Sequence, residues 1–139
     1  MNTEDFVTYE QALSLKKLGF NERCLYYYNV NEQIVANERD YQEEVSVKDL
    51  YISYNSEYTS YNRIDAPTLA QAQKWLRKEK NLYVCSEIDI VDTEDNKYFW
   101  TIYKLPSKKQ IWKTTSFDSP EEALSAGITE CLKLLEKKD

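Results

Sequence analysis

The spacing of apolar and polar positions predicts a helix in the middle of the chain that runs directly into a strand. Leu69, Ala72 and Leu76 recur at helical spacing and would form one apolar stripe. At the start of this stripe, Thr68 and Gln71 have the spacing of a capping box, in which each side chain binds a backbone N–H of the first turn. The pattern therefore predicts an amphipathic helix from about residue 68 to the residues just before Leu82.

A period of two follows this helix and predicts a half-buried strand. Apolar side chains alternate with more polar ones up to residue 91, and the apolar positions are Leu82, Val84, Ile88 and Ile90. Turn-forming residues then separate two further strands, predicted over residues 98–103 and 111–117. Three consecutive strands with short connections indicate an antiparallel meander.

Two more helices and two short strands complete the prediction. A first helix begins after Thr8 and ends at Gly19, and a last helix begins after Ser119 with Pro120 in its first turn. The expected core positions of the last helix are Leu124, Ile128, Cys131 and Leu135. Strands are expected over residues 24–30 and 34–36, whereas residues 51–61 fit either a strand or a loop. We therefore predict one compact α+β domain over residues 1–139, in which an antiparallel sheet packs with about three helices.

Charge and composition describe an ordinary globular chain with an acidic first half. Residues 1–65 hold 6 Lys+Arg against 12 Asp+Glu, whereas residues 66–139 hold 12 of each, and the net charge is −6. A negative surface repels nucleic-acid phosphates, so nucleic acid is an unlikely partner unless a local basic patch intervenes. No apolar run is long enough to span a bilayer, and the acidic start does not resemble a secretory signal. Cytoplasmic residence is the expectation, with three free, mostly buried thiols at Cys24, Cys85 and Cys131.

Two absences narrow the chemistry that the chain can perform. It has no histidine, which excludes Ser-His-Asp and Cys-His nucleophilic systems and His-ligated zinc. Its two glycines, Gly19 and Gly127, lie far apart, so no glycine-rich loop can cradle a phosphate. We therefore predict no catalytic residue, no cofactor and no metal site.

Three short patterns nevertheless invite sharper interpretations. Asp92, Glu94 and Asp95 resemble the start of a calcium loop, but the turn glycine and the later ligands are missing, which favours a solvated acidic hairpin. Residues 95–97 match an acid-x-Lys nuclease motif, yet they fall in a turn rather than in a strand. Four lysines near Trp112 form a basic hairpin that either binds a phosphate backbone or keeps the sheet soluble: Lys104, Lys108, Lys109 and Lys113.

Three segments carry a resemblance to a family. Residues 8–24, 66–77 and 117–128 look like the corresponding parts of a family of small proteins of unknown function from gut bacteria, their prophages and their mobile elements. That family is expected to have proline at the position of Arg23 and often histidine near Lys80, so no shared polar site is inferred there. The resemblance implies an accessory gene of a phage or mobile element, and it implies no activity.

A cluster of tyrosines supplies the candidate binding site. Residues 51–61 contain four tyrosines among mostly Ser, Asn, Thr and Glu, a mixture that suits adaptable contact surfaces. We expect Tyr54, Tyr58 and Tyr61 to contact a protein partner with a basic surface, because the first half of the chain is acidic. The alternative is that these rings are half-buried on a sheet.

The sequence therefore favours a small, non-catalytic protein-binding accessory module. Two alternatives remain from the residues alone. One is a nucleic-acid-associated protein that uses the lysine-rich hairpin, and the other is a hydrolase of unknown class. The sequence makes no prediction about oligomeric state.

Overall fold

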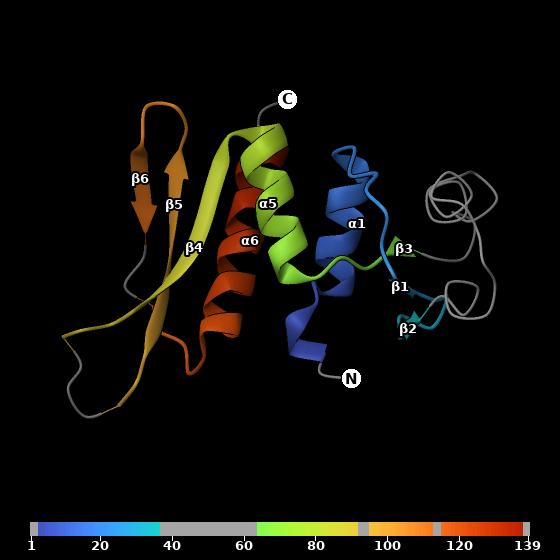
Figure 1. Ribbon diagram of the computed structural model, residues 1–139, viewed down its shortest axis with the longest axis horizontal. Helices are drawn as coiled ribbons and strands as arrows, with labels where there is room; N and C mark the ends of the chain where they lie inside the picture. Colours follow the sequence, from blue (N-terminus) through green and yellow to red (C-terminus); the bar gives the residue numbers. More distant parts are fainter. Residues whose placement is uncertain (1–2, 37–63, 92–94, 113–114, 138–139) are drawn as a thin grey trace. The chain divides into compact units, whose positions relative to one another are not determined.

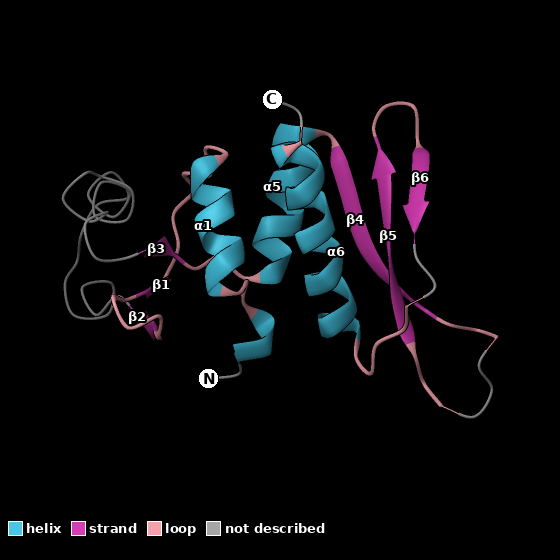
Figure 2. Ribbon diagram, turned by 180° about the vertical axis from the view of Figure 1, so that it is seen from behind, coloured by secondary structure: helices cyan, strands magenta, loops and turns pink. Residues whose placement is uncertain are grey.

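The chain has an α+β fold. Its structure, a computed structural model, describes residues 3–36, 64–91, 95–112 and 115–137. Within these ranges there are three α-helices and two three-stranded antiparallel sheets, which confirms the predicted fold class (Figures 1 and 2). The chain divides into two compact units, one made of Met1 with Phe6–Pro67 and the other of Asn2–Asp5 with Thr68–Asp139. A single domain stays a prediction.

The first unit contains one helix and a small sheet. Thr8 and Gln11 form the predicted capping box, since Thr8 Oγ1 accepts the Gln11 N–H at 3.2 Å and Gln11 Oε1 accepts the Thr8 N–H at 2.8 Å. Gly19, at φ 100°, follows the helix in a conformation that favours glycine. The sheet order is β2-β1-β3. The elements are α1 (Tyr9–Lys17), β1 (Tyr26–Tyr28), β2 (Ile34–Ala36) and β3 (Ile64–Asp65).

Tyr28 connects this sheet to the segment that precedes α1. Its hydroxyl donates to the Val7 carbonyl at 2.5 Å, and its ring meets the ring of Tyr9 edge to face at 5.6 Å. Burial, together with the charge of Glu10, raises the pKa of Tyr28 above 10.0. The strand predicted over residues 24–30 is shorter than expected, because the turn begins at residue 29 and leaves Val30 75% exposed. The sequence did not predict the two-residue strand β3.

The second unit contains two helices and the predicted meander. Its sheet has the order β4-β5-β6, and both pairs are antiparallel. Helix α6 packs on β4 and β5, whereas α5 packs on β4 and α6. The elements are η1 (Thr3–Asp5), α5 (Leu69–Lys80), β4 (Leu82–Ile88), β5 (Tyr98–Lys104), β6 (Lys109–Trp112) and α6 (Pro120–Glu136).

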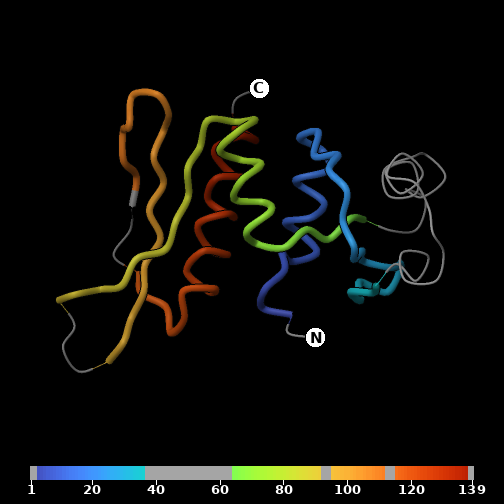
Figure 3. The backbone as a smooth tube through the Cα atoms, viewed as in Figure 1, coloured from blue at the N-terminus to red at the C-terminus, as the bar shows by residue number. Residues whose placement is uncertain are grey.

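The predicted junction between α5 and β4 is confirmed. The Thr68 hydroxyl accepts the Gln71 N–H at 3.1 Å at the start of the helix. Asn81 ends it at φ 58°, and the chain reverses there into β4, as Figure 3 shows. Leu76 of the apolar stripe is buried as predicted, at 0% exposure, and Trp75 beside it is buried as well, at 4%.

Helix α6 approaches the sheet through a glycine. A Cβ atom added to Gly127 would lie 2.6 Å from Val84 Cγ2 and 2.9 Å from Trp100 Cβ, so no larger residue fits without movement. This close approach rotates the helix relative to the expected stripe. Ile128 and Cys131 are buried as predicted, but Leu124 and Leu135 are only half-buried, and other residues take their place: Ala123, Gly127 and Leu132.

Two predicted strand boundaries are wrong. β4 ends at Ile88, and Ile90 and Val91 are each 85% exposed. The reason is local, because the Asp89 side chain accepts the Val91 N–H at 3.0 Å and turns the backbone away from the ladder. The third strand begins at Lys109 rather than at residue 111, since the turn closes early at Lys108 (φ 66°), and residues 115 and 116 are not part of it. Phe117 contributes only an isolated bridge, to Tyr98.

Candidate binding face of the second sheet

The tyrosines proposed from the sequence lie outside the described residues. Tyr54, Tyr58 and Tyr61, with the neighbouring Tyr51, fall between residues 37 and 63. Their contact with a partner therefore stays a prediction. A different set of aromatic and polar side chains is brought together by the sheet of the second unit.

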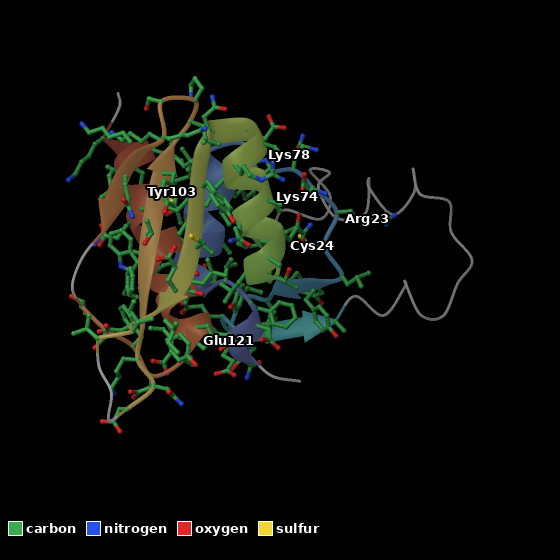
Figure 4. The ribbon with its side chains drawn as sticks, turned by 60° about the vertical axis from the view of Figure 1, so that its left-hand side comes forward. Arg23, Cys24, Lys74, Lys78, Tyr103 and Glu121 are labelled. Atoms are coloured by element: carbon green, nitrogen blue, oxygen red, sulfur yellow. The ribbon has the colours of Figure 1, made fainter. Side chains whose placement is uncertain are left out.

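The register of β4, β5 and β6 sorts their side chains onto two faces, because residues directly opposite each other point to the same side. Val84 lies opposite Ile102 on the face that α6 covers, and both are fully buried. The alternate residues lie on the other face, and in Figure 4 Tyr103 is seen on the sheet with α6 behind it. We call this set the open face: Tyr83, Cys85, Glu87, Phe99, Thr101, Tyr103 and Gln110.

One end of the open face is a row of two tyrosines and a glutamine. Tyr83 is opposite Tyr103, and Tyr103 is opposite Gln110. The two tyrosine rings are stacked, with centroids 6.2 Å apart and an interplanar angle of 25°. Tyr83, near the start of β4, is 38% exposed. The pair thus presents a flat aromatic surface with polar tips, which is typical of contact surfaces.

The other end of the open face carries a carboxylate. Glu87 is exposed and lies opposite Phe99. Among the described residues, its carboxylate has no ion pair and no hydrogen bond. Burial raises the pKa of the half-buried Cys85 thiol above 9.0, and the charge of Glu87 raises it further. The pKa of Tyr103 is likewise raised, by desolvation and then by the charge of Glu87. The charge of Glu87 therefore acts on the neighbouring Cys85 thiol and on Tyr103.

Thr101 lies in the middle row of the open face. It is opposite Cys85 and fully buried, and among the described residues its hydroxyl oxygen has no hydrogen-bond partner. A buried hydroxyl without a partner costs free energy, so this position is not optimised for the stability of the isolated chain.

The free edge of β4 is partly closed. The ladder bond from the Asp89 N–H to the Lys97 carbonyl shows that odd-numbered residues of β4 bond to β5. Even-numbered residues therefore direct their backbone groups outward. At Val84 this outward carbonyl accepts a hydrogen bond of 2.6 Å from Gln73 Nε2 of α5. A strand that added itself to this edge would have to displace Gln73, so the open face is the better contact surface.

The other motifs found in the sequence form no site among the described residues. The Lys97 ammonium makes an ion pair with Asp118, which occupies the lysine of the acid-x-Lys pattern. Asp92 and Glu94 lie outside the described residues, and within the described part of the chain no three His, Cys, Asp or Glu side chains are grouped as metal ligands. The basic turn between β5 and β6 is present, with Lys108 and Lys109 exposed, while Lys113 falls in a gap between the described ranges.

Cysteines and basic residues elsewhere in the described ranges add no second site. All three cysteines are free thiols, and Cys24 and Cys131 are buried as predicted, but Cys85 is only half-buried. Burial raises the pKa of Cys131 to about 12, which makes its thiol inert. Lys74 and Lys78 lie on the exposed side of α5, as Figure 4 shows, and serve as a solvated helix surface.

Sequence reasoning missed the open face because it treated Tyr83, Cys85 and Glu87 only as the polar side of an alternating strand. A usable signal was present, since tyrosine and cysteine are unusual on a fully solvated surface. The partner of Tyr83 could not be found in this way, because the pairing with Tyr103 depends on the register of β4 and β5.

Comparison of the chain with protein-family models, with curated proteins and with solved structures gives no match. None of the described helices is long and apolar enough to cross a bilayer. The functional argument therefore rests on the open face itself.

Proposed function

We propose that this protein is a non-catalytic binding module and that the open face contacts a protein partner with a basic surface. The observation that carries the proposal is the stacked, partly exposed pair of Tyr83 and Tyr103 on the same face as the carboxylate of Glu87, which is unpaired among the described residues. Tyrosines contribute large contact area at low entropic cost, and they are enriched where binding energy is concentrated. The negative charge of Glu87 favours a positively charged partner.

The same observations argue against a phosphate backbone as the ligand of this face. Glu87 is its charged side chain, and Lys104 lies opposite Leu82 on the side of the sheet that α6 covers. We further infer that the protein resides in the cytoplasm, which is supported by three cysteines that form no disulfide. The resemblance to accessory proteins of phages and mobile elements would make the partner a protein of the host or of the element.

Site-directed photo-crosslinking tests the proposal and also identifies the partner. A photoreactive phenylalanine analogue replaces Tyr83 in one variant and the exposed Lys74 of α5 in a matched control. We expect a discrete protein adduct from position 83 and none of the same mass from position 74. The adduct is identified by mass spectrometry, and its binding is then measured with purified components.

The purified partner provides the quantitative test. Tyr103→Ala should weaken its binding at least tenfold, a loss of about 1.4 kcal/mol or more, as expected for an aromatic hot spot. Lys74→Ala should leave the affinity unchanged, and both variants should keep the melting temperature of the parent within a few degrees. Equal adducts from positions 83 and 74, or a Tyr103→Ala variant with the parent's affinity, would overturn the proposal.

A further inference from the structure

Glu87 is a carboxylate that the described fold leaves without a counter-ion. It is exposed at the end of β4, and the register places Phe99 opposite it and the pair of Cys85 and Thr101 in the adjacent row. Lys97, close to the same end of the sheet, is already paired with Asp118. Asp89 and Lys97 form the next row beyond Glu87 and Phe99. Among the described residues no cation is paired with Glu87 itself, so its carboxylate can pair with a cation of another molecule.

The chemistry beside Glu87 favours one kind of cation. Phe99 faces Glu87 across the strand pair, so one aromatic ring borders the carboxylate on the open face, and Tyr103 lies two rows further along the same strand. A ring attracts a cation that lies over it. A guanidinium is planar, binds a carboxylate through two parallel N–H bonds and stacks on rings, whereas an ammonium does none of these as well.

The pKa values of the Cys85 thiol and the Tyr103 hydroxyl are consistent with a cation site at Glu87. Glu87 raises the pKa of both Cys85 and Tyr103, so its charge is felt over the middle and the far row of the face. A cation bound at Glu87 would oppose this rise in pKa. It would lower the pKa of the Cys85 thiol, which gives the site a chemical readout that is independent of affinity.

We propose that the open face recognises an arginine side chain of the partner, with the guanidinium paired to Glu87 and lying against the ring of Phe99. This inference rests on the proposed function and names the chemical group that the face binds. Glu87 provides the charge complementarity and Phe99, which lies opposite it, provides the stacking surface.

The test uses the full chain and three small probes of matched shape: the N-acetyl methylamides of arginine, lysine and citrulline. Backbone amide shifts in nuclear magnetic resonance spectra report where each probe binds. We expect arginine to shift the amides of Cys85, Glu87 and Phe99 with a millimolar dissociation constant, lysine to bind several-fold more weakly, and neutral citrulline to cause no saturable shift. Bound arginine should also speed the reaction of Cys85 with an uncharged thiol reagent.

Variants separate this site from general acidity of the surface. Glu87→Gln should weaken arginine binding at least tenfold and abolish the effect on Cys85. The matched control is Glu121→Gln, which removes a carboxylate from the first turn of α6, labelled in Figure 4, and should leave both unchanged. Melting curves of the two variants should overlay that of the parent.

Several results would overturn the inference. It fails if arginine and lysine cause equal shifts, or if Glu87→Gln and Glu121→Gln lose the same arginine affinity. It also fails if the chain forms a dimer that Glu87→Gln dissociates, because the occupant of the face would then be a second copy. The crosslinked partner distinguishes this failure from failure of the binding module. If the partner binds Glu87→Gln as tightly as the parent, the arginine site is wrong and the protein-binding function stands. If position 83 gives no adduct, the binding function fails whatever the probes show.

Discussion

The two faces of the β4-β5-β6 sheet come from the same strands, but only one of them has side chains that close packing requires. On the covered face, Val84 and Trp100 lie so close to α6 that only a glycine fits at position 127. On the open face, Tyr83 is partly exposed, Glu87 is unpaired among the described residues, and the Thr101 hydroxyl is buried without a partner there. Packing against α6 explains the residue types on the covered face, whereas the stability of the fold does not explain those on the open face.

This difference indicates which residues of the sheet are candidates for binding. Close packing constrains size and shape, so the covered face tolerates few substitutions. A sheet face that α6 does not cover could consist of threonine, lysine and glutamate at no cost to the fold. Side chains that are poorly suited to stability on that face are therefore the better candidates for binding. Substitutions at closely packed positions should cost more stability than substitutions on the open face.

The largest effect is expected at Trp75, which is buried on α5. Its exposure is 4%, and its ring also lies 5.5 Å from the Lys80 ammonium. Truncation of a buried tryptophan to alanine costs about 3–5 kcal/mol. Trp75→Ala should therefore be largely unfolded or melt far below the parent in thermal denaturation. The exposed neighbour variant, Lys74→Ala, should melt with the parent, and a small shift for Trp75→Ala would show that the helix layer is loosely packed.

Gly127 gives the next largest effect. Valine at this position would place a branched Cβ against Val84 and Trp100, at a point where even one carbon atom is too close. Overpacking of this kind costs about 1–3 kcal/mol. Gly127→Val should lower the free energy of unfolding in urea accordingly.

The adjacent Ala126→Val variant controls for the helix propensity of valine, because residue 126 is only half-buried. It should lose no more than about 1 kcal/mol, the range of ordinary helix propensities. If both variants lose the same amount, the contact at Gly127 does not decide how α6 packs.

Much of the covered face could be predicted from the sequence, because burial produces a periodic signal. The spacing of Leu69, Ala72 and Leu76 located α5, and Thr68 located its start. The exact stripe of α6 could not be predicted. It depends on contact between Gly127 and two strands, and local spacing contains no information about that contact.

The open face could be predicted far less well. The alternation in β4 shows that Tyr83, Cys85 and Glu87 share a side, but the rows that they form with β5 depend on register. The side-chain turn at Asp89 also ended β4 earlier than its apolar pattern suggested. The tyrosines chosen from the sequence were selected by local composition, which does not depend on where the sheet places its own aromatic residues.

A pH-dependent effect of intermediate size is expected from Cys131 on the covered side. Burial raises its pKa from 9.0 to about 12 in the folded chain. The unfolded thiol loses its proton first, so this contribution to stability is complete below pH 9 and falls as the pH rises toward 12. The slope is at most about 1.4 kcal/mol per pH unit. The free energy of unfolding in urea is measured at about pH 8 and at about pH 10. Between these two pH values it should fall less for Cys131→Ala than for the parent. An equal loss would mean that the thiol is not protected in the folded state.

The smallest effect is a gain, and it concerns Thr101 at the centre of the open face. Valine has nearly the same shape as threonine, and it removes the buried hydroxyl for which the described residues provide no partner. Thr101→Val should therefore raise the free energy of unfolding by about 1 kcal/mol. Ser86→Ala, a hydroxyl removed from the half-buried opposite side of β4, is the control and should change little. A destabilised Thr101→Val would mean that the hydroxyl is satisfied in solution, and the open face would then be as well adapted to folding as the covered one.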